Sequence, residues 1–515
     1  MKWTFSADNQ PFFIIGGQVH NSSAYDLQSM EIAWKSLELI KANTAEVPIY
    51  WEQVEPNPDQ FSFDHLDQII QAARKRGLHL ILLWFATWKN GSMQYTPQWV
   101  KTNPTRFERV INPAGASTWV LSSHCDANWK ADCKAYCTLL RHLRAVDVDQ
   151  KTVIGTQIEN EPGILGSVRD YSRVAQAEFG DPVPKEVLDL IGAHPGNADW
   201  ESVFGDKAAE YFSAWSVARY IDRLAAKGKE IYELPVYVNV WIKENGWHLP
   251  GINYPSGGAT TNVLDIWKRI GKHIDLIAPD IYVQNLDIYR LLCQSYSRPD
   301  NPLFIPESGN SQANAILLFE AIAHYQAIGY AIFGIESLLD QEGNLRPEAR
   351  PIVDSFHCLA AARPLIEQYS GTGKIHSVGQ QEWLGEQLFD FDSYLGLARF
   401  VNRPAGGWEF TDFNHYPPDK NQRGRGLIFT PRPNEFYLVG SGYSLFLRPK
   451  VNERMEFSKA SADYDAPLTH YLAVEEGHFN HAGNWIVDRT RNGDEITGGL
   501  WVAPDIGVLH AVLTE

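Results

Sequence analysis

The chain has 515 residues, of which 44% are hydrophobic and 21% charged, and its formal net charge is −17. This length predicts two or three domains with a large core, and the composition is that of an ordinary globular protein. The negative charge disfavours binding to nucleic acid or anionic membranes, which would repel the protein, and suits an uncharged ligand. The sequence has no apolar run of about 18 residues, so we expect a soluble protein without a membrane-spanning helix.

The cysteines and the N-terminus give expectations about the compartment. The five cysteines are odd in number and lack CxxC spacing, which predicts neither a disulfide framework nor a zinc site. Buried free thiols explain Cys133 and Cys137, four residues apart on a predicted helix. The N-terminus lacks the apolar core of a signal peptide, so we expect a cytoplasmic protein. A chain from which a signal had been trimmed would begin in the same way.

Strands and helices alternate through the first two thirds of the sequence. An apolar, β-branched run over 12–20 predicts a strand buried on both faces, and a helix is predicted over 24–41 with Ser22 or Ser23 as its N-cap. Strands over 43–51 and 79–88 enclose a helix over 64–75. Further strands are predicted over 155–163, 235–242, 274–282, 302–308 and 329–337, and further helices over 206–227, 262–272, 311–325 and 347–362.

Eight such βα units across roughly 350 residues fit a TIM (β/α)₈ barrel with insertions. The competing architecture, a doubly wound sheet, would normally carry a Gly-rich phosphate loop after an early strand, and this sequence has none there. Two long excursions, 89–151 and 162–234, both follow strands. They should therefore extend the C-terminal rim of the barrel, where loops shape pockets.

After about residue 362 short alternating stretches replace the helical pattern. Asn492-Gly493 is a hairpin signal, because both residues tolerate positive φ. We predict a catalytic barrel over 1–362 and an all-β, sandwich-like accessory domain over 367–515. Strands of this second domain are expected over 427–430, 435–439, 444–447 and 484–488.

Two carboxylates end strands of the predicted barrel. Glu161 is followed by Pro162, which cannot donate to a strand ladder and so ends the fourth strand. Glu307 ends the seventh strand. Because the carboxyl ends of barrel strands share one mouth, we expect the two carboxylates to converge there. Two carboxyls roughly 5–5.5 Å apart cleave a glycosidic bond with retention, one as the proton donor and the other as the nucleophile.

Asn160-Glu161 at the end of strand four, together with Glu307, resembles the retaining glycoside hydrolases built on (β/α)₈ barrels. Gln157-Ile158-Glu159-Asn160-Glu161 is similar to the acid/base motif of family 35 β-galactosidases, and the segment 51–67 is similar to the one after strand two in families 35 and 42. The resemblance covers roughly residues 10–340. It implies an exo-acting β-galactosidase with Glu161 as acid/base and Glu307 as nucleophile. Strand three departs from family 35, because it lacks Arg-Pro-Gly-Pro-Tyr, which leaves the sugar open.

Further candidate site residues lie at other predicted strand ends. Tyr282 would either hydrogen-bond the nucleophile or be a core tyrosine. Asn160 would either donate to the hydroxyl beside the anomeric carbon or only end its strand. Glu159 would share a face with Glu161 but lie deeper. The remaining candidates, for which turn capping or core packing is the alternative, are His20, Asn21, Trp88, Trp241 and Glu336.

Two rival functions stay open. A metal-dependent sugar isomerase or hydrolase would gather a divalent ion at the mouth, although no chelating His-x-His pair is present. Its ligands would be His20, Glu161, Asp280 and Glu307. The other rival is a carbohydrate-binding barrel without turnover. The favoured prediction is a retaining exo-glycosidase, with β-galactosidase as first choice, that needs no metal or other cofactor. Its expected partner is an oligo- or polysaccharide, and a homo-oligomer is compatible with the sequence.

Overall fold

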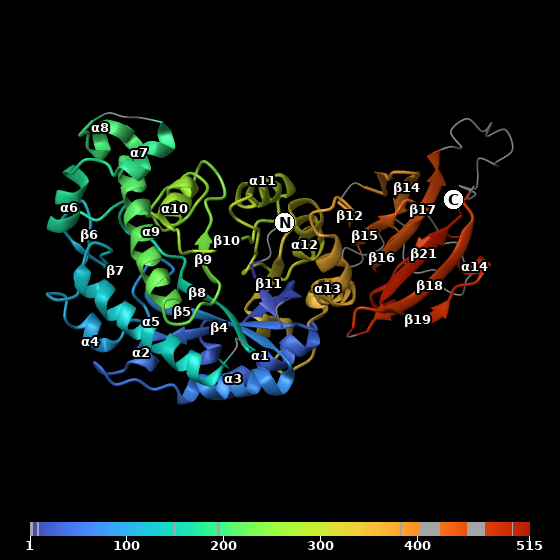
Figure 1. Ribbon diagram of the computed structural model, residues 1–515, viewed down its shortest axis with the longest axis horizontal. Helices are drawn as coiled ribbons and strands as arrows, with labels where there is room; N and C mark the ends of the chain where they lie inside the picture. The colour runs from blue at the N-terminus through green and yellow to red at the C-terminus, as the bar shows by residue number, and fades with distance from the viewer. Residues whose placement is uncertain are drawn as a thin grey trace.

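The computed structural model describes residues 4–7, 10–148, 151–192, 196–381, 384–400, 423–450, 469–480, 482–496 and 498–514. An α/β barrel forms one end of the elongated molecule and an all-β part forms the other (Figure 1). Both predicted fold classes are confirmed. Within the described residues, no helix combines the length and the apolar character that a membrane span requires.

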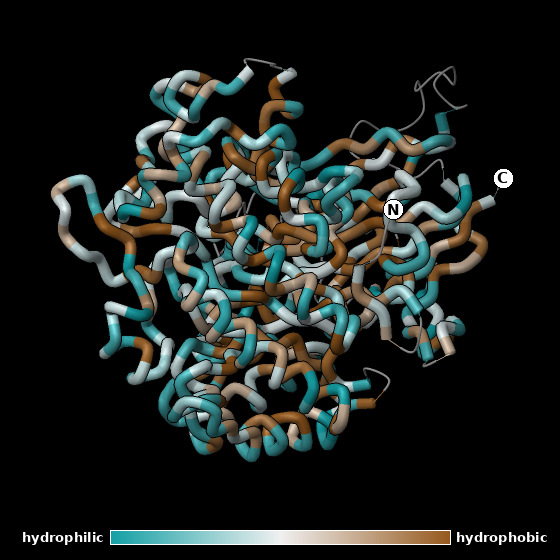
Figure 2. The backbone as a smooth tube through the Cα atoms, turned by 60° about the vertical axis from the view of Figure 1, so that its left-hand side comes forward, coloured by the Kyte–Doolittle hydropathy of each residue, from teal (hydrophilic) through white to brown (hydrophobic). Residues whose placement is uncertain are grey.

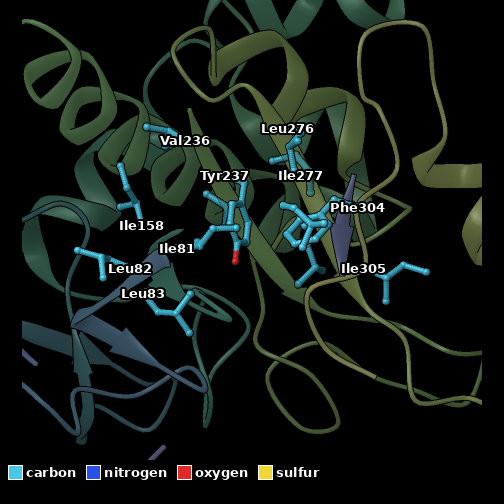
Figure 3. Close-up of a cluster of buried hydrophobic side chains, with 14 of the residues drawn as sticks. Ile81, Leu82, Leu83, Ile158, Val236, Tyr237, Leu276, Ile277, Phe304 and Ile305 are labelled. Atoms are coloured by element: carbon cyan, nitrogen blue, oxygen red, sulfur yellow. The ribbon is translucent and has the colours of Figure 1, made fainter. Parts of the chain in front are cut away.

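Seven parallel strands form the curled sheet of the barrel, in the order β10-β9-β8-β5-β4-β3-β11. They are almost entirely buried, because helices cover the outside and side chains fill the inside. Figure 3 shows part of this packing, with Tyr237 and Phe304 among aliphatic side chains. The strands are β3 Ile14–Gln18, β4 Thr44–Tyr50, β5 His79–Lys89, β8 Val153–Asn160, β9 Val236–Trp241, β10 Leu276–Asp280 and β11 Gly329–Phe333.

The segment 302–308, predicted as the seventh strand, is not a regular strand. Pro306 has no N–H group to donate, which interrupts a ladder at this point. The segment still closes the barrel between β10 and β11, and the carbonyl oxygen of Glu307 accepts from the N–H of Ile281 at 2.9 Å. Its pairing consists of isolated parallel bridges, Ile281 with Ser308 and Ile305 with Tyr330.

Helices surround the barrel, and the outer turns are more hydrophilic than the strands inside (Figures 1 and 2). The first long helix begins later than predicted, because Asp26 rather than Ser22 or Ser23 is its N-cap and accepts from the N–H of Ser29 at 2.8 Å. The main helices are α1 Leu27–Leu39, α3 Asp64–Arg76, α5 Asp126–Val146, α9 Ala208–Lys229, α10 Leu264–Ile270, α11 Leu286–Tyr296, α12 Gln312–Tyr325 and α13 Arg350–Tyr369.

The two long excursions lie on the side of the barrel away from the all-β part (Figure 1). Besides α5 and α9, their elements are α4 Gln98–Lys101, β6 Arg109–Ile111, β7 Ser117–Leu121, α6 Arg173–Gly180, α7 Lys185–Ile191 and α8 Trp200–Phe204. Short pieces elsewhere are β1 Ser6–Ala7, β2 Gln10–Pro11 and α2 Trp51–Val54. All five cysteines are free thiols, and Cys133 and Cys137 are buried on α5.

Two antiparallel sheets share an apolar core in the all-β part, as a sandwich requires. One sheet has the order β12-β15-β16-β21-β18-β19 and the other β13-β14-β17-β20. The four predicted strands coincide with parts of β15, β16, β17 and β19, and the last begins one residue before β19. The strands are β12 Ile375–Gly379, β13 Glu386–Asp390, β14 Tyr394–Arg399, β15 Arg425–Arg432, β16 Glu435–Ser441, β17 Ser444–Pro449, β18 Tyr471–Phe479, β19 Trp485–Thr490, β20 Leu500–Trp501 and β21 Val508–Leu513.

The predicted hairpin at Asn492-Gly493 is wrong. The chain instead forms a helical turn, α14 Gly493–Ile496, after β19. The side-chain oxygen of Asn492 accepts from the N–H of Glu495 at 3.1 Å, and the Glu495 carboxylate accepts from the N–H of Asn492 at 3.0 Å. This reciprocal capping favours a helical turn over a two-residue hairpin.

Helix α13 joins the two parts of the chain and runs past the end predicted at residue 362. The buried Arg425 of β15 fixes the contact, because its guanidinium donates to the Ser355 hydroxyl at 2.9 Å and to the Pro351 carbonyl at 3.0 Å, both on α13. The helix thus belongs to the packing of both parts. The division into domains at 362 and 367 stays a prediction.

Candidate active site

A cavity of about 260 Å³ opens at the carboxyl ends of the barrel strands. It is smaller than the roughly 300–1,000 Å³ typical of sites for drug-sized ligands, so it suits a small ligand. Its polar lining comes mainly from residues that directly end or follow strands. The lining residues are Asn21, Lys89, Asn90, Glu161, Trp241, Ile242, Glu244, Asp280, Tyr282, Glu307 and Phe333.

Three buried carboxyls converge in this cavity. One oxygen each of Glu161, Asp280 and Glu307 lies within 4.8 Å of an oxygen of the other two. Glu161 and Glu307, far apart in the sequence, therefore meet as the barrel topology predicts. Asp280 was considered only as a metal ligand in the sequence analysis, and the structure adds it to this group.

The backbone that carries Glu161 is strained. Glu159 and Glu161 have φ values of 62° and 44°, in the left-handed region that residues other than glycine rarely adopt. Such a conformation persists only where its surroundings hold it, and here the N–H of Glu161 donates to Asn239 Oδ1 at 2.8 Å. The strained turn directs Glu161 into the cavity.

Glu307 is surrounded by hydrogen-bond donors. Its Oε1 accepts from Gln18 Nε2 at 2.8 Å, and its Oε2 accepts from the Tyr282 hydroxyl at 2.8 Å. The side-chain amides of Asn239 and Asn160 face Oε1 at 3.3 and 3.4 Å. These donors hold the Glu307 carboxylate in a fixed orientation beside the cavity, which is what a carboxylate nucleophile requires.

Glu161 has the opposite character. Burial raises the pKa of its carboxyl to about 8, the negative charge of Glu307 adds to the shift, and Lys89 opposes it. At neutral pH the carboxyl therefore carries its proton. A protonated carboxyl beside an anionic one is the arrangement that acid-assisted cleavage with a nucleophile needs.

Lys89 fixes the orientation of Asn160. The buried ammonium of Lys89 donates to Asn160 Oδ1 at 2.7 Å and also contacts Asn90. Because an ammonium can only donate, the oxygen of the Asn160 amide faces Lys89 and its NH₂ group faces Glu307. Burial lowers the pKa of Lys89, whereas the three carboxyls favour its charged form.

Only some of the other predicted site residues line the cavity. Asn21 and Trp241 line the cavity, but Trp88 is fully buried against Tyr220 and is a core residue rather than a sugar contact. Glu336 accepts from the backbone N–H of His20 at 3.1 Å, so it holds the turn after β3 and does not line the cavity. His20 is exposed, with its ring near Phe333.

Glu159, the competitor of Glu161, is buried behind the cavity. Its carboxylate accepts from the N–H of Trp88 at 2.7 Å. Burial raises its pKa well above the usual value, and the neighbouring Asp132 adds to the shift. Glu159 therefore holds the end of β5 through this hydrogen bond and is not available to a ligand.

Tyr282 gives a test of the site. We expect Tyr282→Phe to reduce kcat/KM for a glycoside by about 10- to 100-fold, because Glu307 loses a hydrogen bond to a charged group, worth about 1.5–3 kcal/mol. Steady-state kinetics measure the change. Tyr25→Phe is the matched control, since that hydroxyl donates to Glu52 at 3.2 Å and does not line the cavity. Equal kinetics of both variants would contradict the assignment.

Part of the barrel matches a known protein family. Residues 24–221 match the model of glycoside hydrolase family 42, described as beta-galactosidase. The barrel of this chain resembles the family 42 β-galactosidases. The match is to family 42, and the likeness to family 35 stays a prediction. Residues 352–503 match a domain of unknown function, DUF5597. A comparison with curated proteins gives no match.

Solved structures share the fold. A β-galactosidase of the psychrophilic Marinomonas ef1 has 12% identity and a TM-score of 0.52, with 69% of this chain and 61% of that chain covered. A catalytic mutant of Gan42B, a family 42 β-galactosidase of G. stearothermophilus, has 15% identity and a TM-score of 0.52, with 72% and 58% covered. The chain thus spans less than two thirds of the length of these two structures, and the identities show the fold alone.

A β-amylase gives a further comparison. The catalytic domain of the enzyme from Paenibacillus polymyxa has 11% identity and a TM-score of 0.50, with 66% of this chain and 96% of that chain covered. Structures described as β-galactosidase and β-amylase thus match the same barrel. The fold therefore does not select the sugar or the reaction, and the arrangement of the carboxyls must do so.

Proposed function

We propose that the protein is a retaining, exo-acting glycoside hydrolase, with β-galactosidase as the favoured activity, in which Glu161 is the acid/base and Glu307 the nucleophile. The observation that carries the proposal is the approach of their carboxyl oxygens to within 4.8 Å. Retaining enzymes separate the two carboxyls by roughly 5–5.5 Å, whereas inverting enzymes need roughly 6.5–9.5 Å to admit a water. The family 42 match over residues 24–221 supports the choice of galactose.

In the first step Glu307 attacks the anomeric carbon while Glu161 gives its proton to the leaving oxygen. The Glu307 carboxylate thereby becomes an ester and loses its charge. Since that charge helps to raise the pKa of Glu161, the pKa falls once the ester forms. Glu161 can then accept a proton from the water that attacks the glycosyl-enzyme and releases Glu307.

The other residues of the cavity would bind the sugar. Asn160 turns its NH₂ group toward Glu307, which places it to donate to the hydroxyl beside the anomeric carbon. Asn21 and Trp241 line the wall. The cavity of about 260 Å³ suits one terminal sugar and so supports exo-action on an oligo- or polysaccharide. The cytoplasmic location and a homo-oligomer stay predictions.

A panel of nitrophenyl glycosides tests the proposal, with galactose, fucose, arabinose, glucose and mannose compared side by side. NMR of the first product should show the anomeric configuration of the substrate. An inverted product, or no hydrolysis of any member, would contradict the proposal. Success on another sugar with failure on the galactoside would change only the sugar. Activity that survives exhaustive chelation would remove the metal-dependent alternative.

The pH dependence follows from the raised pKa of Glu161, about 8. Because the first step needs the protonated form, kcat/KM for a nitrophenyl glycoside should be constant through neutral pH and fall as pH rises past about 8. The profile of kcat/KM between pH 5 and 10 measures this. A limb that begins near the usual pKa of glutamate, about 4.3, would show that Glu161 is not the acid.

A further inference from the structure

Asp280 is a third carboxyl of the cavity that the two-carboxyl mechanism does not use. It ends β10 and is 2% exposed. Its Oδ2 accepts from Asn239 Nδ2 at 2.8 Å. Its Oδ1 is buried, and no N–H or O–H group of the described residues donates to it. The carboxyl lies instead beside that of Glu161, with one oxygen of each within 4.8 Å of the other.

Two ionised carboxylates buried this close together would repel each other, and neither could donate a hydrogen bond to the other. The charges around the site also disfavour two ionised carboxylates. Among the described residues, Lys89 is the one cation that faces the three carboxyls, and the anionic Glu307 compensates it. A further buried negative charge would be unpaired and would cost several kcal/mol. The hydroxyls that face this group, those of Tyr237, Tyr282 and Tyr296, supply no positive charge.

We propose that Asp280 remains protonated at neutral pH and that its Oδ1 donates a hydrogen bond to Glu161, so that Asp280 positions the acid/base. This inference rests on the proposed role of Glu161. Burial raises the pKa of Asp280 well above its usual value, and Glu307 and Glu161 add to the shift. Asn239 holds the pair, because its amide donates to Asp280 and its oxygen accepts from the N–H of Glu161.

The proton on Asp280 matters in the second step of the reaction. After Glu161 has given its proton to the leaving group, its carboxylate accepts the hydrogen bond from Asp280 rather than facing a second negative charge. Asp280 keeps its own proton throughout. Glu161 regains a proton only from the attacking water, so the protons balance over one turnover.

A divalent cation among the three carboxyls would be the alternative. Donors already face the carboxyl oxygens, since Asn90 contacts Glu161, Asn239 contacts Asp280 and Tyr282 contacts Glu307. The Lys89 ammonium adjoins the same group and would repel a second cation. These contacts favour a proton over a metal ion.

Two substitutions of Asp280 distinguish a neutral donor from a charged carboxylate. Asp280→Asn keeps a neutral donor toward Glu161 and an acceptor toward Asn239, so kcat should fall by about 3- to 10-fold. Asp280→Leu removes the donor, so kcat should fall by about 100-fold. The pKa of Glu161 should rise, because its charged form loses a hydrogen bond, and the alkaline limb of the kcat/KM profile should move to higher pH. Equal losses in both variants, with an unmoved limb, would overturn the proposal.

Infrared difference spectra supply a readout that does not depend on activity. The spectrum of the wild type minus Asp280→Asn at pH 7 should contain the carbonyl band of a protonated carboxyl. Asp199→Asn is the control without this band, because Asp199 is the N-cap of α8 and hydrogen bonds from Ser202 lower its pKa. Absence of the band for Asp280, or its loss on adding magnesium or calcium, would overturn the proposal. Inactivity of the wild type on every glycoside would contradict the proposed function and leave this measurement intact.

Discussion

Replacement of Glu307 by glycine is expected to reduce the hydrolysis of an activated aryl glycoside by a factor on the order of 10⁴ or more, because the covalent route through the nucleophile is lost. The change leaves the backbone bond from Ile281 N–H to the carbonyl of residue 307 in place, so the barrel should still close. It also vacates a space beside the anomeric carbon. Azide should enter that space, restore turnover and yield a glycosyl azide of inverted configuration.

Kinetics with and without azide, followed by NMR of the product, measure this result. Rescue itself shows that the variant is folded, since an unfolded site would not use azide. Glu52→Gln serves as the control, because that carboxylate pairs with Lys101 at 3.3 Å and does not line the cavity. A loss of less than tenfold in the Glu307 variant would exclude it as the nucleophile.

The parts of the fold that follow from local pattern could be predicted from the sequence. Apolar runs with short links indicated the barrel strands, and proline after Asn160-Glu161 indicated where one strand ends. The segment 302–308 was predicted as a strand because its composition is apolar, but its prolines leave only isolated bridges. The hairpin at Asn492-Gly493 failed because a side chain three residues later, Glu495, caps a helical turn instead.

Only part of the site could likewise be predicted from the sequence. Glu161 and Glu307 were found because strand ends and a family motif point to them. Gln18, Asn239 and Asp280 lie within or at the end of apolar strands, where a single polar residue has many structural explanations. Only closure of the barrel brings them together around one cavity. Lys89 offered a signal that was missed, since a lysine followed by Asn90-Gly91 directly ends the third strand. Trp88, one position earlier, points into the core.

Replacement of Glu161 by glutamine should separate its acid role from its base role. For a glycoside with a poor leaving group, kcat/KM should fall by about 10²- to 10⁴-fold, because the leaving oxygen receives no proton. A dinitrophenyl glycoside needs no such proton, so its kcat/KM should change little. Its kcat should still fall, since no base activates water in the second step, and the glycosyl-enzyme should accumulate.

The two glutamate variants should therefore give opposite products with azide. In the Glu161 variant azide attacks the glycosyl-enzyme formed on Glu307, and the glycosyl azide keeps the configuration of the substrate. In the Glu307 variant no such intermediate exists, and the configuration inverts. The fall of kcat/KM above about pH 8 should also disappear with Glu161, because the group whose pKa sets that limb is gone. An equal loss for every leaving group would mean that Glu161 only holds the site together, and the acid would have to be sought in Asp280, the third buried carboxyl of the cavity.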